Sequence, residues 1–247
     1  MTNNIPNDAF ILAAGKGTRL RPYTDDKPKP MVDVAGKPIL HHTVEKLEKI
    51  GVKNITINLY YLGDRIKNYF KNWRGVQINF SEETELLETG GGIKLALNTI
   101  KNDAFYIING DALWSDGENG EDALLQLAEA WDPTKMDILL LLQPVSDMNL
   151  TKGVGDYNIN HDGTITRTPD QSGKYMFTGL RISNKGIFKD TPEGAFSYLQ
   201  CMDAAQQNNR LYGVEYKGQW HHISTPQDLD NVNGFFAKAE NNIKRKA

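Results

Sequence analysis

Short, continuous apolar runs alternate with amphipathic stretches along the first 144 residues, and this alternation constrains the fold most. Residues 9–14, 104–108 and 138–142 are almost entirely apolar. Such runs are typical of strands that are covered by helices on both faces, as in a parallel sheet. Leu40, Val44 and Leu47 recur at helical spacing with charged residues between them. The pattern predicts an α/β fold, with a mostly parallel, mixed sheet flanked by helices.

The individual elements can be predicted from the same pattern. We expect strands over 9–14, 52–59, 76–80, 104–108 and 136–142, and helices over 39–50, 65–71, 92–100 and 121–131. After about residue 144 short strands are expected over 153–159, 164–168 and 175–182, and then a helix, a strand and a helix over 196–206, 211–216 and 226–239. No hexapeptide repeat predicts a C-terminal β-helix. We expect 1–247 to form one domain in two parts, about 1–144 and about 145–240.

Composition excludes several classes of function. The net charge of −3 gives no overall basic field for nucleic acid or an anionic membrane. The single cysteine excludes an internal disulfide and a multi-cysteine zinc site. The apolar runs are far too short to span a bilayer, and no signal peptide is recognisable, so a cytoplasmic protein is expected.

A glycine-rich, basic loop follows the first predicted strand. It reads Gly15-Lys-Gly17-Thr-Arg-Leu-Arg-Pro, and its neighbourhood holds five cations within fifteen residues: Lys16, Arg19, Arg21, Lys27 and Lys29. Glycines after a buried strand bring backbone N–H groups against a phosphate, which indicates a triphosphate cradle. A Walker loop would need Gly-Lys-Ser/Thr, and a dinucleotide fingerprint would need a third glycine where Leu20 stands. A solvated basic loop remains the alternative.

The run Gly-x-Gly-Thr-Arg-Leu-x-Pro-x-Thr, with Pro28-Lys29-Pro30 after it, resembles the signature of the sugar-1-phosphate nucleotidyltransferases. The resemblance extends more loosely to about Asn233. It implies a Rossmann-like core with a nucleotide-binding part, about 1–144, and a sugar-binding and C-terminal part, about 145–240. It also implies two catalytic cations, Arg19 on the leaving pyrophosphate and Lys29 between the α-phosphate and the sugar phosphate.

A second glycine motif, Glu88-Thr-Gly-Gly-Gly92, precedes the helix predicted over 92–100. Its wording is similar to that of the N-acetylmuramate-1-phosphate uridylyltransferases, which are short members of the same family. A flexible helix start is the alternative interpretation. The resemblance implies these nucleotide-binding residues: Ala13, Ala14, Gly15, Lys16, Gly17, Thr18, Glu88, Gly91 and Asn109.

The metal site implied by the resemblance is altered in this chain. Asp111 follows a predicted strand and would hold a divalent ion. The segment Gln219–Pro226 resembles a late family motif, Trp-x-Asp-Ile/Val-Gly-Thr-Pro, but His222 stands for its metal-binding aspartate and Ser224 for its glycine. Magnesium prefers oxygen ligands, whereas imidazole suits manganese or zinc better. Mg²⁺ is the expected ion, and Mn²⁺ or another divalent ion is the alternative because of His222. Four interpretations of His222 remain open: it is a metal ligand, it lies beside a site that uses Asp111, phosphates and waters alone, it is a sign of weak activity, or it is a structural residue.

The sugar pocket is expected, by resemblance, to use Gly153, Gly155, Asp156, Thr178 and Gly179. A lysine that many relatives place on the sugar phosphate is missing, because Arg167-Thr-Pro169 occupies the matching stretch. The carboxylate of a muramate would need a cation, and Lys152 and Arg167 are the candidates; surface charge is the alternative interpretation of both.

The expected function is that of an enzyme that joins a sugar 1-phosphate to a nucleoside triphosphate and releases pyrophosphate. UTP and N-acetylmuramate 1-phosphate are the specific expectation. A guanylyl- or cytidylyltransferase for another sugar phosphate is one alternative, and a nucleotide-sugar-binding protein with reduced catalysis is another. The sequence predicts no oligomeric state.

Overall fold

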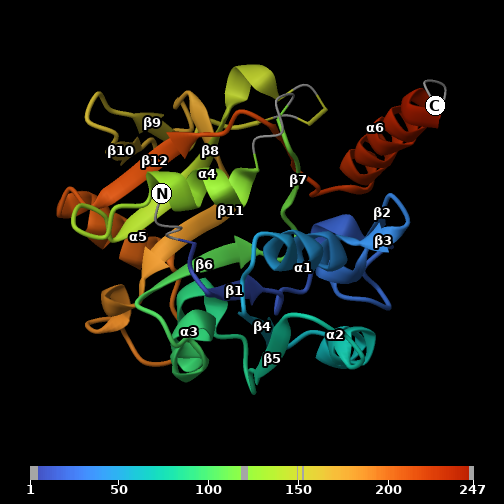
Figure 1. Cartoon of the computed structure of the whole chain (residues 1–247), viewed down its shortest axis with the longest axis horizontal. Helices are drawn as coiled ribbons and strands as arrows, with labels where there is room; N and C mark the ends of the chain where they lie inside the picture. The colour runs from blue at the N-terminus through green and yellow to red at the C-terminus, as the bar shows by residue number, and fades with distance from the viewer. Residues whose placement is uncertain (1–4, 118–121, 149, 152, 245–247) are drawn as a thin grey trace.

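A nine-stranded mixed sheet forms the centre of the computed structural model, which describes residues 5–117, 122–148, 150–151 and 153–244. Figure 1 shows the sheet crossing the molecule from β5 at the bottom to β12 near the top. The strands follow in this spatial order: β5 (Gln77–Glu82), β4 (Asn54–Leu59), β1 (Asp8–Leu12), β6 (Ala104–Asn109) and β11 (Tyr175–Asn184), after which the sheet continues through β8 (Ile138–Pro144) to β12 (Leu211–Glu215) and through β9 (Tyr157–Ile159) to β10 (Ile165–Arg167).

The strand directions confirm the predicted mixed, mostly parallel sheet. β1 is parallel to β4 and β6, β4 is parallel to β5, and β8 is parallel to β12. Only β11 and β10 run against the other strands of this sheet, since β11 is antiparallel to β6, β8 and β9, and β10 is antiparallel to β9. The four neighbouring parallel strands β1, β4, β5 and β6 all come from the first 109 residues, and the antiparallel strand β11 joins them to the rest of the sheet.

Helices cover both faces of the sheet, as the apolar strands require. The core on one face includes side chains of α1 (Ile39–Lys49), α2 (Gly63–Phe70) and α4 (Ala123–Ala130). The core on the other face includes side chains of α3 (Glu88–Leu95) and α5 (Leu199–Gln207). Along β1, Ala9 and Ile11 point into the first core and Phe10 into the second. This two-sided burial explains why the run is apolar at every position.

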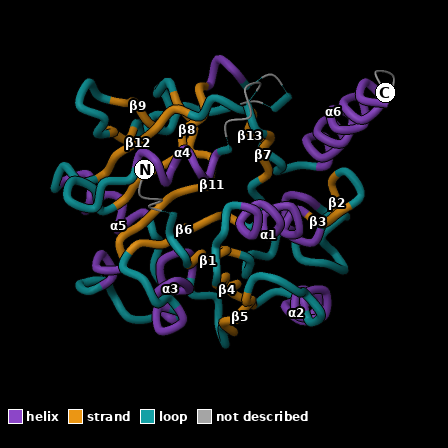
Figure 2. Tube along the Cα trace, in the orientation of Figure 1, coloured by secondary structure: helices purple, strands orange, loops and turns teal. Residues whose placement is uncertain are grey.

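The last part of the chain returns to the start of the molecule. β13 (Gln219–His221) pairs with β7 (Leu113–Ser115), and α6 (Pro226–Lys244) contacts the hairpin of β2 (Asp33–Val34) and β3 (Lys37–Pro38). Leu229 and Val232 anchor α6 in a third apolar cluster, while its far end extends away from the body (Figures 1 and 2). The sequence did not predict β2, β3, β7 or β13, because two or three residues are too few to show a period.

Several predicted boundaries were wrong. The helix predicted over 92–100 begins at Glu88 and ends at Leu95, with a short 3₁₀ turn over Leu97–Thr99. α5 begins at Leu199 rather than 196, and β9 covers only the end of the predicted 153–159 strand. α6 continues five residues beyond the predicted end. The start of the helix predicted over 121–131 lies partly outside the described residues, which show α4 with Asp122 capping its N-terminus.

Packing explains why α3 includes the glycine triplet. The N–H groups of Gly90 and Gly91 donate to the Phe196 carbonyl at 2.8 and 3.1 Å. A Cβ on Gly90 would collide with the Phe196 ring, and one on Gly91 with the Gly194 carbonyl. The glycines therefore let a helix lie directly against the segment that precedes α5, and helix propensity is overridden by this contact.

Replacing Gly91 with alanine is expected to lower the free energy of unfolding by about 1–3 kcal/mol, because the Gly194 backbone must move. Gly234 is the matched control, since a Cβ there meets no atom within 4 Å and the residue lies exposed in α6. Gly234→Ala should raise the free energy of unfolding by up to about 1 kcal/mol. Urea unfolding without ligand measures the free energy of unfolding of both variants. If the two substitutions change it by the same amount, the contact of α3 with Gly194 is looser than described.

Candidate active site

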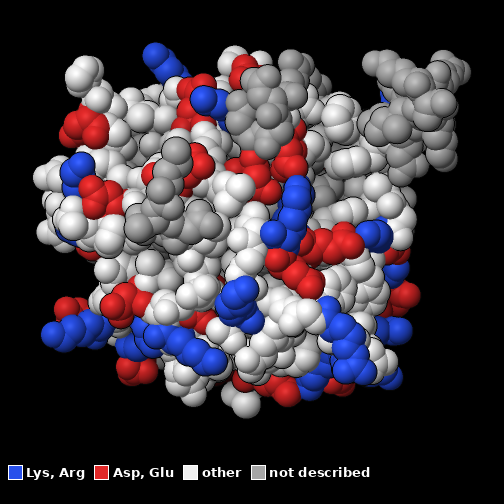
Figure 3. Space-filling model, viewed as in Figure 1, with Lys and Arg blue, Asp and Glu red and all other residues white. Residues whose placement is uncertain are grey.

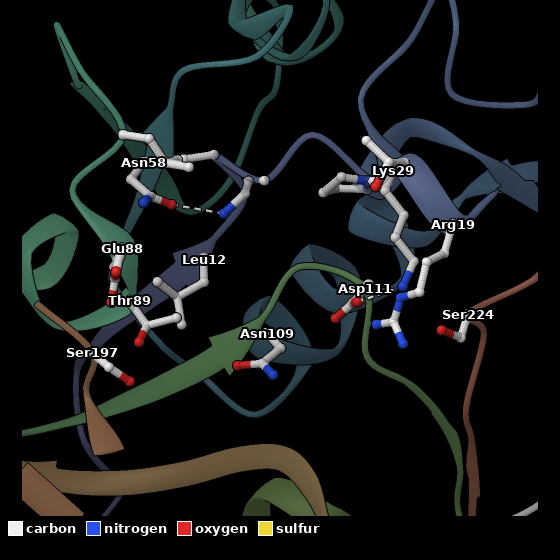
Figure 4. A pocket seen from close by; sticks show the side chains of 17 residues that line it. Leu12, Arg19, Lys29, Asn58, Glu88, Thr89, Asn109, Asp111, Ser197 and Ser224 are labelled. Carbon is white, nitrogen blue, oxygen red and sulfur yellow. Dashed lines mark hydrogen bonds and ion pairs between the residues drawn. The ribbon is translucent and has the colours of Figure 1, made fainter. Parts of the chain in front are cut away.

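A cleft of about 520 Å³ opens at the carboxyl ends of β1, β4 and β6. Open α/β sheets bind ligands at this edge. Figure 4 shows side chains from both sides pointing into it. The lining residues come from widely separated segments: Leu12, Ala13, Ala14, Gly15, Gly17, Thr18, Arg19, Lys29, Pro30, Asn58, Leu86, Glu88, Thr89, Asn109, Asp111, Ser197 and Ser224.

The loop after β1 folds back on the segment that carries Lys29. Gly17 has a φ of 62°, which favours glycine, and a Cβ on it would lie 2.8 Å from the Lys29 Cβ. The Thr24 hydroxyl donates to the Gly17 carbonyl at 2.9 Å and holds this fold. At Gly15, by contrast, a Cβ would meet no atom within 4 Å, so the loop is open toward the cleft there. This arrangement suits backbone contact with an anionic ligand.

Asn58 fixes the inner end of the same loop. Its side-chain oxygen accepts from the Ala13 N–H at 2.6 Å, and its amide nitrogen donates to Glu83 at 2.6 Å. Glu83 also accepts from the Leu87 N–H at 3.0 Å, and burial raises the pKa of its carboxyl group. One chain of hydrogen bonds thus joins the loop after β1 to the start of α3. The sequence does not single out Asn58, because Asn54 and Thr56 stand earlier in the same strand and no apolar run ends at Asn58.

The start of α3 forms one end of the cleft. Glu88 has a φ of 59°, which is uncommon for a residue with a side chain, and it lines the cleft beside Thr89. The Thr89 hydroxyl accepts from the Tyr198 N–H at 2.8 Å and so ties α3 to the segment around Ser197. Gly91 and Lys16, both expected to bind nucleotide, are not among the lining residues.

Charged groups gather at the opposite end. The Lys29 ammonium group lies 2.6 Å from the Asp111 carboxylate, although only 9% of Lys29 is exposed. Arg19 extends toward the same pair in Figure 4, and Ser224 faces it from the other side. The Ser224 hydroxyl is buried without a hydrogen-bond partner among the described residues. The structure thus places Arg19, Lys29 and Asp111 together at one end of the cleft, while the roles expected of them stay predictions.

His222 lies beside this charged end. Its ring stacks on Trp220, with 5.2 Å between the ring centroids and 16° between the planes. Burial lowers the pKa of His222, and the positive charge of Lys29 lowers it further. Asp111 acts in the opposite direction, which shows that both candidate metal ligands belong to one electrostatic neighbourhood. Within the described ranges no group of three or more His, Cys, Asp or Glu side chains is placed to hold a metal ion.

His221 has a structural role. It is buried against Phe235 and Phe236, and its Nε2 lies 2.8 Å from the Ser115 hydroxyl on the paired strand β7. Burial lowers the pKa of His221 to about 4. The two consecutive histidines therefore face different surroundings: His221 is the last residue of β13 and packs against α6, whereas His222 follows the strand and stacks on Trp220.

His221 should make stability depend on pH. Its folded-state pKa of about 4 is below the ordinary 6.5, so the unfolded chain binds the proton more readily. The stabilising contribution is complete above pH 6.5 and is lost as the pH falls toward 4, by about 3 kcal/mol in total. The free energy of unfolding, measured with urea at pH 7 and at pH 4.5, should change less between the two pH values in His221→Gln than in the wild type. His161→Gln, at an exposed position, is the control and should keep the wild-type slope.

A second cavity of about 360 Å³ adjoins the cleft and shares Thr89, Asn109 and Ser197 with it. Its other lining residues come mainly from the later part of the chain: Asp156, Tyr157, Arg167, Thr168, Pro169, Gln171, Phe177, Arg181, Tyr198, Leu199 and Met202. These later residues all belong to the part, about 145–240, that the sequence analysis expects to bind the sugar, and this role stays a prediction.

Of the five expected sugar-binding residues, Asp156 lines the second cavity. Gly155 lies against the Gly173 carbonyl, where a Cβ would collide, and Gly153 lies against Met148. The Thr178 hydroxyl donates to the Leu141 carbonyl at 2.8 Å, away from the cavity. Gly179 has a φ of 83° and lies directly beside Asn109, a residue that lines both cavities.

The cations expected near a sugar carboxylate differ in their surroundings. Arg167 lines the second cavity but pairs with Asp203 through two nitrogens, at 3.1 and 3.3 Å. Lys152 lies outside the described residues. Arg181, which the sequence analysis did not select, is buried beneath the cavity wall.

A model of the nucleotidyl transferase family matches residues 8–239. The chain belongs to this family. An N-acetylmuramate alpha-1-phosphate uridylyltransferase of Caulobacter vibrioides is 33% identical, over 90% of this chain and 93% of the relative. A bifunctional protein GlmU of Methanococcus maripaludis is 31% identical over 93% of this chain, which corresponds to 54% of that longer protein. The crystal structure of HddC from Yersinia pseudotuberculosis complexed with GMP-PN is 31% identical, with a TM-score of 0.74 over 93% of this chain and 99% of HddC.

These similarities confirm the recognised family and its fold. They also support the general activity, transfer of a nucleotidyl group to a sugar 1-phosphate. No helix in the described part of the chain is long and apolar enough to cross a membrane. Acidic and basic side chains are interspersed over the face drawn in Figure 3.

Proposed function

We propose that this protein joins UTP to N-acetylmuramate 1-phosphate and releases pyrophosphate. The observation that carries the general reaction is the meeting of Arg19, Lys29 and Asp111 at one end of a cleft that lies at the carboxyl edge of the sheet. The specific substrates are supported by relatives in Caulobacter vibrioides and Neisseria meningitidis, 33% and 30% identical, that carry the name of this uridylyltransferase.

The proposed reaction needs no general base. A phosphate oxygen of the sugar 1-phosphate attacks the α-phosphorus, a new P–O bond forms, and the bond to the leaving pyrophosphate breaks. The barrier comes chiefly from bringing two anions together in line. Lys29 is a point charge held by Pro28, Pro30 and its ion pair, whereas the guanidinium of Arg19 can bind two phosphate oxygens at once. Lys29 is therefore suited to the reacting phosphates, and Arg19 to the leaving pyrophosphate.

The donors present fit a magnesium ion that completes its coordination with substrate. Asp111 offers a carboxylate oxygen, 40% of its side chain is exposed, and no larger ligand cluster surrounds it in the described residues. Magnesium in nucleotide enzymes is commonly bound through one or two carboxylates together with substrate phosphates and waters. Such an ion would neutralise the triphosphate and orient its α-phosphate. His222 is the second candidate donor, and its nitrogen favours manganese or another transition metal.

One alternative has support of its own. The HddC structure, complexed with GMP-PN, is 31% identical to this chain, so a pocket for a guanine nucleotide is compatible with the fold. The base end of the cleft, formed by Glu88, Thr89, Asn58 and Ser197, contains donors and acceptors that do not by themselves select a base. A binding protein with reduced catalysis is the second alternative, and His222 is its only support.

Pyrophosphate release should be measured with UTP, CTP, GTP, dTTP and ATP against several sugar 1-phosphates. We expect UTP with N-acetylmuramate 1-phosphate to give the highest kcat/KM.

Arg19→Ala and Lys29→Ala should each lower kcat by roughly 10²–10³, as expected when one charge-stabilising donor is removed. Lys37→Ala, which removes an exposed lysine paired with Glu45, is the control. A folded protein that binds nucleotide but turns over no pair would contradict the enzyme proposal.

His222→Asp tests the metal ligand. Replacing imidazole with a carboxylate should raise activity with Mg²⁺ relative to Mn²⁺, because magnesium prefers oxygen. The ratio of rates in the two metals, measured at saturating substrates, gives the answer. If the ratio is the same in the wild type and the variant, His222 is not a ligand.

A further inference from the structure

Arg181 is an arginine buried in the middle of the sheet. It lies on β11, opposite Ile107 of β6 and Leu140 of β8, and its exposed fraction is 2%. Ile107 and Leu140 both belong to the apolar core on the α3 and α5 side, so the guanidinium enters that core. Removing a charge from water is costly unless a group of opposite charge compensates it.

No carboxylate compensates Arg181 in the described part of the chain. One terminal nitrogen donates to the Asn109 side-chain oxygen at 3.3 Å, and the Nε has no hydrogen-bond partner. The Tyr198 ring lies 4.4 Å and the Phe177 ring 5.4 Å from the guanidinium carbon. Burial lowers the pKa of Arg181, while a hydrogen bond and a charge interaction with the Tyr198 side chain act in the opposite direction. Arginine nevertheless stays protonated in proteins, so the positive charge remains.

The second cavity has two other charged lining residues, and one of them, Arg167, is part of an ion pair in the described structure. Arg167 forms its two-nitrogen ion pair with Asp203, and Asp156 accepts a hydrogen bond from the Phe177 N–H. No ion pair joins Asp156 to Arg181 among the residues described. Arg181 is thus the cation of this cavity wall that lacks an anion.

The place of Arg181 indicates which anion it serves. The second cavity meets the nucleotide cleft at Thr89, Asn109 and Ser197, whereas Lys29, Arg19 and Asp111 lie at the other end, beyond Asn109 in Figure 4. An anion beside Arg181 is therefore separate from the reacting phosphates. The planar guanidinium matches a carboxylate, with which it forms paired hydrogen bonds.

We infer that Arg181 determines specificity by binding a carboxylate carried on the sugar of the 1-phosphate substrate, at the rear of the second cavity. The inference rests on the proposed function, and it assigns the role to Arg181 rather than to Arg167 or Lys152. An acidic substituent would supply the missing counter-charge, and a neutral sugar would leave the guanidinium uncompensated. The neighbouring Asn109 would keep the guanidinium oriented between the two cavities.

The test compares two sugar phosphates that differ in the acidic substituent. In Arg181→Met, kcat/KM for N-acetylmuramate 1-phosphate should fall by about 100-fold or more, because the carboxylate loses its partner. For N-acetylglucosamine 1-phosphate, which lacks the carboxylate, it should change by less than about 3-fold. Arg181→Lys should lie between the wild type and Arg181→Met, since it keeps the charge but loses the fork. Arg167→Met should keep the wild-type ratio between the two sugar phosphates.

A binding measurement separates this inference from the proposed reaction. N-acetylmuramate without phosphate, added at millimolar concentration, should raise the melting temperature of the wild type but not of Arg181→Met, while N-acetylglucosamine should affect neither. This result would support the role of Arg181 even if no pyrophosphate were released. Arg181→Met should melt no lower than the wild type without ligand, because a buried charge is removed; if it fails to fold, Arg181→Lys carries the same comparison. Equal losses of kcat/KM for both sugar phosphates in Arg181→Met would mean that Arg181 binds phosphate, and would overturn the assignment. No loss for either sugar phosphate would overturn it as well, and so would a loss in Arg167→Met that is selective for N-acetylmuramate 1-phosphate.

Discussion

The site depends on a contact that has no room for a side chain. Gly110 follows β6, and its N–H donates to the carbonyl of Leu12, the last residue of β1, at 2.8 Å. A Cβ on Gly110 would lie 2.6 Å from that carbonyl oxygen and 3.1 Å from Pro30. Three segments that are distant in sequence therefore converge at one glycine. The next residue, Asp111, consequently reaches Lys29, and the charged end of the cleft exists because these backbones can touch.

The parts of the fold and site that the sequence predicted are those encoded locally. Apolar runs located β1, β6 and β8 to within a few residues, because both faces of these strands are buried. The loop after β1 and Asp111 were recognisable because they follow such runs. Asn58 was missed, since its importance lies in hydrogen bonds to Ala13 and Glu83 that only the folded chain brings together. The division of the chain at about residue 144 and the roles of the individual site residues stay predictions.

The sugar end was harder to predict because β11 is irregular. Its register against β8 shifts between Phe177 and Arg181, and such a bulge changes which side chains face each side. Thr178 consequently bonds to the β8 backbone, while Arg181 lies beneath the second cavity. In the sequence, Arg167 and Arg181 are two similar cations on strands that follow one another along the chain. Only the folded structure distinguishes the arginine that Asp203 neutralises from the one that lacks a carboxylate.

The late return of the chain has a consequence for synthesis on the ribosome. Ser224 lines the cleft and β13 pairs with β7, although more than a hundred residues separate the two strands in sequence. Domains form as the chain emerges from its N-terminus, and β1, β4, β5 and β6 are all present once residue 109 has emerged. The glycine-rich loop and Asp111 therefore exist on a nascent chain well before the wall that carries Ser224 arrives. The cleft is completed only after residues 219–224 have emerged, when β13 pairs with a strand that left the ribosome more than a hundred residues earlier.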